Sequence, residues 1–127
     1  MSKLLALLVL SGLLLFGCAS QPAAPSAPAV APVSGGVQEL SVTAKQFEFS
    51  PSTITVKKGV PVKLTITSQD VEHGFAIAEF NVNTKLQPGQ AAVVEFTPDK
   101  AGEFTFFCSV VCGAGHGSMK GKLIVTE

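Results

Sequence analysis

Alternating apolar and polar residues recur in short runs from residue 37 to the C-terminus, and this pattern constrains the fold more than any other feature. Side chains along a β-strand point alternately to its two faces, so a strand that is buried on one side repeats every second residue. Turn-forming pairs such as Pro88-Gly89 and Pro98-Asp99 separate the runs. The pattern predicts an all-β domain, a Greek-key sandwich of two antiparallel sheets. The clearest runs carry Ile54 and Val56; Val62, Leu64 and Ile66; Phe75 and Ile77; Val94 and Phe96; Phe104 and Phe106; and Leu123 and Val125.

The length and charge of the chain narrow the classes of function. Its 127 residues suffice for one compact domain with appendages. Lys+Arg and Asp+Glu both count 9, and every base is a lysine. A chain without net positive charge or an arginine cluster lacks the electrostatic footprint of a nucleic-acid-binding protein. We therefore expect no nucleic-acid partner, and we expect the domain to be a monomer.

The N-terminus has the pattern of an export signal. Lys3 precedes an apolar run from Leu4 to Phe16, which is 13 residues long and has no charged residue. A membrane-spanning helix needs about 20 apolar residues, whereas a secretory signal peptide has a shorter apolar region after a positive residue. The run ends in Leu15-Phe16-Gly17-Cys18, which resembles the lipobox of bacterial lipoproteins. We expect residues 1–17 to be a cleaved signal peptide.

Cys18 would then be lipidated at the new N-terminus. The alternative is an ordinary signal that leaves Cys18 as a free thiol, which would be exposed to oxidation. A multi-chain lipid anchor also provides the stable tether that one acyl chain does not. We therefore expect an exported protein, held at the outer face of the bacterial cytoplasmic membrane or in the periplasm.

Residues 18–36 have the composition of a spacer. Prolines stand at positions 22, 25, 28 and 32, and the segment from Gln21 to Gly36 has no charged residue. Such a Pro/Ala-rich segment favours an extended, disordered conformation. We expect it to link the anchor to a globular domain at residues 37–127.

The residues with metal-binding chemistry gather in one segment of 12 residues, Cys108 to Met119. Two thiols, an imidazole and a thioether favour copper or zinc over magnesium or calcium, and an axial thioether is typical of copper electron-transfer sites. Glycines at 113, 115 and 117 allow the backbone to fold tightly around an ion. A disulfide between Cys108 and Cys112 is the alternative, because exported proteins meet an oxidising compartment. A disulfide would not explain why His116 and Met119 follow at this spacing. It would also close only a short loop and so gain little stability.

This segment resembles the binuclear copper A site of cytochrome oxidase subunit II, whose motif is Cys-x-x-x-Cys-x-x-x-His-x-x-Met. The resemblance covers the 91 residues from Val37 to Glu127 and includes an upstream histidine, here His73. It implies a cupredoxin sandwich, the architecture that the strand pattern predicts independently. It also implies that Cys108 and Cys112 bridge two copper ions.

The resemblance implies roles for the remaining ligands as well. His73 and His116 would each bind one copper ion, Met119 would be a weak axial ligand, and the backbone carbonyl of Val110 would be the other. Many members of the family have Glu where this chain has Val110, and valine can supply only its carbonyl. Apolar side chains would keep water from the sulfurs; we expect this of Phe75, Phe106, Phe107 and Val111.

The resemblance implies a one-electron carrier that passes electrons to or within a respiratory oxidase chain. Its partners would be cytochrome c or a small copper protein and the oxidase. No pattern of a catalytic base or oxyanion hole is present, so we expect no catalysis by this chain alone, only a contribution as the electron-accepting component of cytochrome c oxidase. A mononuclear copper carrier, a copper chaperone and a purely structural lipoprotein module are the alternatives. Cys112 speaks against the first, the lack of helical segments against the second, and the ligand set against the third.

Overall fold

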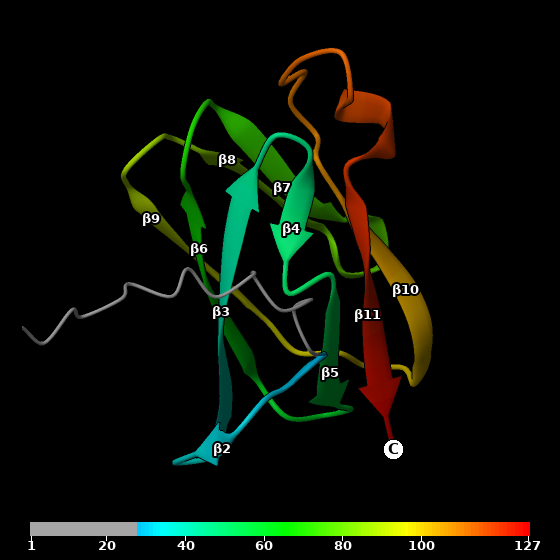
Figure 1. Cartoon of the computed structure of the whole chain (residues 1–127). Helices are drawn as coiled ribbons and strands as arrows, with labels where there is room; N and C mark the ends of the chain where they lie inside the picture. The colour runs from blue at the N-terminus through cyan, green and yellow to red at the C-terminus, as the bar shows by residue number, and fades with distance from the viewer. Residues whose placement is uncertain (1–27) are drawn as a thin grey trace, which may run out of the picture.

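The computed structural model describes residues 28–127, which form two β-sheets packed face to face (Figure 1). One sheet has the strand order β1-β5-β11-β10-β7-β8, and the other has the order β2-β3-β6-β9 with β4 paired to β3. The strands are β1 (Ala29–Val30), β2 (Val33–Ser34), β3 (Val37–Lys45), β4 (Glu48–Ser50), β5 (Thr53–Lys57), β6 (Val62–Ser68), β7 (His73–Ile77), β8 (Val82–Leu86), β9 (Ala91–Phe96), β10 (Gly102–Phe107) and β11 (Lys120–Thr126). Two short 3-10 helices, η1 (Ala78–Phe80) and η2 (His116–Ser118), complete the domain.

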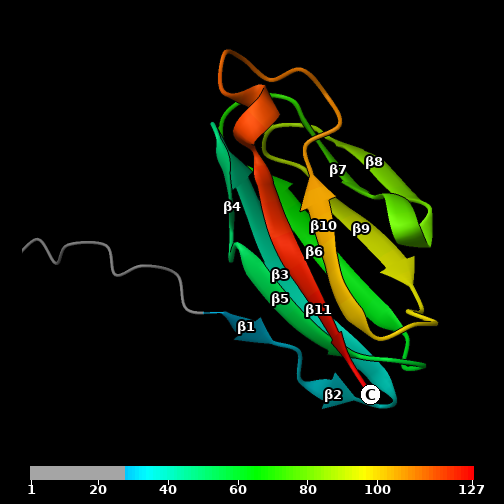
Figure 2. The same cartoon turned by 90° about the vertical axis from the view of Figure 1, so that its right-hand side faces the viewer.

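The predicted sandwich is confirmed, but its sheets are mixed rather than purely antiparallel. Strand β3 pairs with β6 in parallel, and β5 pairs with β11 in parallel. The remaining long pairs, such as β6 with β9 and β10 with β11, are antiparallel. The chain crosses repeatedly from one sheet to the other, so strands that are neighbours in the sequence often lie in different sheets (Figure 2).

The core lies between the two sheets and follows the predicted alternation. In β6 the burial alternates strictly along the strand, with Val62, Leu64 and Ile66 buried. Three phenylalanine rings fill the middle of the core: the ring centroids of Phe75 and Phe106 are 5.2 Å apart, and Phe49 packs edge-on against both. Aromatic contacts of this kind add to the free energy gained by burying the rings. They make the sandwich a rigid support for its loops.

The folded domain begins earlier than the composition predicts. Strand β1 pairs in parallel with β5, strand β2 pairs with β3, and Ala31 between them is buried. An extended, proline-rich segment can add to a sheet edge because edge strands tolerate residues without an N–H group. Two short strands, β1 and β2, therefore lie in the segment that the sequence assigns to the linker, ahead of the domain expected at residues 37–127. The expected signal peptide, Cys18 and the first part of the linker lie outside the described residues.

One end of the sandwich carries the segment with the metal-binding pattern. The chain from β10 to β11 forms a long loop at that end, beside the turn that joins β3 and β4 (Figure 1). Strand β7 begins at His73, which the fold brings to the same end. Within residues 28–127, no helix has the length and apolar character that a membrane crossing requires.

Candidate metal centre

Two buried cysteine sulfurs form the middle of the candidate centre. Cys108 directly follows β10 and Cys112 lies four residues later in the loop; both side chains are buried. Their sulfur atoms are 3.7 Å apart, far more than the roughly 2.0 Å of a disulfide bond, and both cysteines are free. The structure therefore presents a thiol pair, which is the form that can bind a metal.

Each of the two histidines faces one of these sulfurs. His73 is the first residue of β7 and is fully buried, with its Nδ1 atom 3.8 Å from the Cys108 sulfur. His116 opens η2 and is half-buried, with its Nδ1 atom 3.9 Å from the Cys112 sulfur. The Nδ1 atom of His73 and the two sulfurs all lie within 4.8 Å of one another. The fold thus brings together side chains that are 35 residues apart in the sequence.

Each of the two expected axial donors, Val110 and Met119, lies close to one of the two cysteine sulfurs. The Cys108 thiol donates a hydrogen bond to the carbonyl oxygen of Val110 at 3.1 Å. The Met119 sulfur lies 3.8 Å from the Cys112 sulfur and is buried. A backbone hydrogen bond from Cys108 to Met119, 3.0 Å long, closes the base of the loop. All six residues predicted from the sequence motif therefore meet at one end of the sandwich.

Burial affects the protonation of the thiols. It is the largest cause that raises the pKa of the Cys112 thiol to about 11, and the neighbouring Cys108 adds to the effect. At neutral pH the metal-free Cys112 is therefore a thiol rather than a thiolate. Since a metal binds the thiolate, loading this centre must release protons.

Asp70 belongs to the site, although the sequence motif does not include it. One of its carboxylate oxygens lies 2.8 Å from the Nε2 atom of His73, on the far side of the ring from the sulfur. Burial tends to raise the pKa of this carboxyl, but hydrogen bonds from the Gln46 backbone, from His73 and from the Val71 backbone outweigh it and lower the pKa below its ordinary value. A carboxylate behind a ligand histidine fixes the ring and its tautomer. Its position three residues before His73 was the available signal.

The predicted apolar cover of the sulfurs is only half correct. Phe75 and Phe106 are fully buried and belong to the same core cluster as the two cysteines. Val111, in contrast, is 80% exposed, and Phe107 is 38% exposed. Alternation along the chain places these two side chains outward, so they form a rim around the centre rather than a lid over it.

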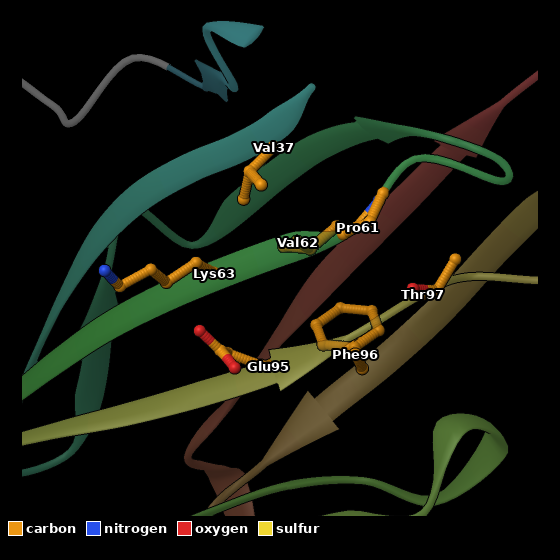
Figure 3. A pocket seen from close by; sticks show the side chains of 7 residues that line it. All are labelled: Val37, Pro61, Val62, Lys63, Glu95, Phe96 and Thr97. Carbon is orange, nitrogen blue, oxygen red and sulfur yellow. The ribbon is translucent and has the colours of Figure 1, made fainter. Parts of the chain in front are cut away.

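Two surface hollows differ in their chemistry. A hollow of about 470 Å³ is lined by His116, Met119, Phe107 and Lys120 together with Cys108, and so it adjoins the centre. A second hollow, of about 350 Å³, lies over β6 and β9 (Figure 3). Its lining offers Lys63 and Glu95 with apolar neighbours, and neither a thiol nor an imidazole. Among residues 28–127, the group of cysteine and histidine donors that could hold a metal ion lies at the loop end.

Fold and donor set together define the class of the cupredoxins. The sequence matches the family of the cupredoxin-like domain over residues 7–125. It is 36% identical over 102 residues to cytochrome c oxidase subunit 2 of Thermus thermophilus, covering 79% of this chain and 76% of that one. The chain therefore belongs to the cupredoxin-like family and, within it, to the family of cytochrome c oxidase subunit 2.

Solved structures are similar to the domain as well. A chain of a heme-copper terminal oxidase dimer matches with a TM-score of 0.67 and 32% identity, over 72% of this chain and 66% of that one. A copper binding protein, solved in its apo form, matches with a TM-score of 0.65 and 30% identity, over 80% of this chain and 99% of that one. These relatives and the donor set of His73, Cys108 and Cys112 imply copper as the metal.

Proposed function

We propose that this protein is an exported one-electron carrier with a binuclear copper A centre, tethered to the membrane and serving a respiratory oxidase. The observation that carries the proposal is the pairing of donors. Each imidazole has its nearest sulfur contact on a different cysteine, at 3.8 and 3.9 Å. The carbonyl of Val110 and the sulfur of Met119 are divided between the two cysteines in the same way.

This pairing favours two metal ions over one. A mononuclear blue-copper site needs a single cysteine with two histidines around it. Here the second sulfur, that of Cys112, is buried, lies 3.7 Å from the first, and has its own histidine and methionine neighbours. In the proposed centre the thiolates of Cys108 and Cys112 and the imidazoles of His73 and His116 would hold the two ions, and the Val110 carbonyl and the Met119 sulfur would be further, weaker donors.

A bound pair of copper ions would supply a centre that accepts and donates one electron with little rearrangement. The chain contributes rigidity, because the ligands stand on strand ends and on a loop closed by its own backbone hydrogen bonds. It also contributes an apolar environment beneath the sulfurs, from the buried rings of Phe75 and Phe106. Both features lower the energy needed to reorganise the site when its charge changes.

The partners follow from the relatives. The chain resembles subunit 2 of a cytochrome c oxidase and part of a heme-copper terminal oxidase. We therefore propose that it accepts electrons from cytochrome c or a small copper protein and delivers them to an oxidase core. By itself it would carry electrons and would catalyse no reaction.

Copper counting and spectroscopy test the centre. The purified protein, reduced to free thiols and loaded with copper, should bind two ions per chain and show one unpaired electron shared between them when oxidised. Cys112→Ser should abolish this spectrum, because the second bridging sulfur is lost. Uptake of one copper with an ordinary mononuclear spectrum, or of zinc alone, would refute the binuclear proposal.

Membrane tethering needs a separate test. We propose that residues 1–17 are removed and that Cys18 carries the lipid anchor, with the segment before Ala29 as spacer. The wild-type protein should then fractionate with membranes, and Cys18→Ala should release it into the soluble fraction, provided that export is retained. A wild-type protein found wholly in the soluble fraction contradicts the anchor and leaves the copper centre unaffected.

A further inference from the structure

Gln46, in the turn between β3 and β4, contacts both parts of the candidate centre. Its backbone N–H donates a hydrogen bond of 2.6 Å to one carboxylate oxygen of Asp70. Its side-chain amide donates another, also of 2.6 Å, to the carbonyl oxygen of Cys112. The second contact joins residues that are 66 positions apart in the sequence. One residue thus touches the loop that carries Cys112 and the carboxylate that contacts His73.

Asp70 transmits this contact to the other ligand. Its Oδ1 atom lies 2.8 Å from Nε2 of His73 and accepts a hydrogen bond of 2.7 Å from the backbone of Val71. Its Oδ2 atom is the one that Gln46 binds. A continuous path of hydrogen bonds therefore runs from His73 through Asp70 and Gln46 to the backbone of Cys112.

The packing around Gln46 leaves little room for the loop to shift. A Cβ atom at Gly113 would lie 2.8 Å from the Gln46 side-chain nitrogen, closer than real Cβ contacts allow. A Cβ atom at Gly115 would overlap the ring of Phe47, the next residue after Gln46. The loop thus lies directly on the β3–β4 turn, and both hydrogen bonds of Gln46 form at close range.

We infer that Gln46 is a positioning residue that holds His73 and Cys112 in register before any metal binds. Its hydrogen bonds reach the carbonyl of Cys112 and the carboxylate of Asp70, so it acts on the two proposed ligands through these groups. Preorganisation of this kind increases metal affinity because less conformational freedom is lost on binding. The inference rests on the proposed function only in the use of copper as one of its probes.

The metal-free protein provides the first test. Gln46→Leu removes the side-chain donor and keeps the backbone N–H, while Gln90→Leu makes the same change at an exposed residue in the β8–β9 connection. One hydrogen bond of typical strength corresponds to roughly a fivefold change in an opening equilibrium. Amide hydrogen exchange of residues 113–119 should therefore be roughly fivefold faster in Gln46→Leu than in the control. Equal exchange rates in the two variants would overturn the inference.

A second variant protects the test against misfolding. Gln46→Glu keeps the shape of the side chain but cannot donate to the Cys112 carbonyl when ionised, so it should accelerate the same amides as Gln46→Leu. Denaturant unfolding of both variants, compared with Gln90→Leu, separates local loosening from global destabilisation. If the amides of 113–119 keep their wild-type exchange rate in Gln46→Glu, Gln46 does not position the loop.

The copper-loaded protein adds a readout that general stability does not move. In Gln46→Leu the visible absorption bands should shift, and release of copper to a chelator should be roughly fivefold faster than in Gln90→Leu. Unchanged bands and an unchanged release rate would contradict a positioning role. If the wild type binds a single copper, the binuclear proposal fails, while hydrogen exchange of the metal-free protein still decides the role of Gln46.

Discussion

The two histidines of the candidate centre make similar sulfur contacts from very different surroundings. His73 stands in a strand, opposite Leu86 in the β7–β8 ladder, with its ring fully buried and Asp70 behind it. His116 stands in a single 3-10 turn, held by hydrogen bonds inside the loop, and is half-buried. The sheet therefore preforms one half of the site. The other half depends on the loop from Cys108 to Met119, part of which is exposed to solvent.

Removal of each imidazole in turn is the most direct test of the difference between the two histidines. His73→Gly and His116→Gly should both abolish the native copper spectrum, because each variant loses one of the proposed ligands. Added imidazole should restore colour in His116→Gly, since the hollow of about 470 Å³ reaches that position from solvent. Added imidazole should not restore colour in His73→Gly, because the wild-type His73 side chain is 0% exposed to solvent. The check is the visible spectrum during titration with imidazole.

Rescue of both variants to the same extent would show that the strand half opens as readily as the loop half. Thermal unfolding of each metal-free variant provides the control, because His73→Gly also leaves a cavity in the core. A His73→Gly protein that is folded yet colourless in imidazole supports the comparison.

Glycine substitutions test how tightly the loop is packed, through their effect on the free energy of unfolding. A Cβ atom at Gly74 in β7 would lie 2.8 Å from the backbone nitrogen of Val110, and one at Gly115 would meet the ring of Phe47. Backbone cannot give way as a half-buried ring can, so we expect Gly74→Ala to lower the free energy of unfolding by about 3 kcal/mol and Gly115→Ala by about 1 kcal/mol. Denaturant unfolding of the metal-free variants measures both.

Gly117→Ala is the matched control for this series. No atom lies within 4 Å of a Cβ placed at Gly117, so the free energy of unfolding should stay close to that of the wild type. If Gly115→Ala destabilises the protein as much as Gly74→Ala does, the Phe47 ring is held as firmly as the backbone of Ser109 and Val110.

The sequence was sufficient for what depends on local periodicity and spacing. The alternation predicted strands where β5, β6, β7, β9, β10 and β11 lie. The spacing from Cys108 to Met119 predicted a cluster of donors, which the structure contains. Parallel pairing of β3 with β6 was not predictable in this way, because register between distant strands leaves no periodic signal. The contact of Gln46 with Cys112, 66 residues apart, is likewise a product of the whole fold.

The outward positions of Val111 and Phe107 were also not predictable from the sequence. Each of them directly precedes a buried cysteine, so the sequence suggested an apolar cover. The direction of each side chain depends on where β10 ends and the loop turns, and the structure leaves Val111 80% exposed. The result is a small apolar rim on the loop half of the site.

The smallest expected effect concerns this rim. Val111, Ala114 and Gly117 are exposed and lie close in sequence to the half-buried His116. None of these three residues has a charged side chain. A partner that docks here would bind by apolar contact with little electrostatic steering, so the transfer rate should depend only weakly on ionic strength. Ala114→Glu should slow electron transfer from a reduced cytochrome c roughly threefold and leave the copper spectrum unchanged. Stopped-flow spectroscopy measures the rate.

Val93→Glu is the matched control, because Val93 is 55% exposed on β9 and gains the same charge away from the ligand loop. A rate that falls in Ala114→Glu but not in Val93→Glu places docking on the loop half of the centre. The transfer rate could instead be unchanged in Ala114→Glu and fall steeply in moderate salt. Docking would then depend on charged side chains such as Lys120, which lines the hollow beside His116. Electrons would then still cross at the half-buried His116, because His73 is fully buried, but the partner would be held by the neighbouring sheet face rather than by the rim.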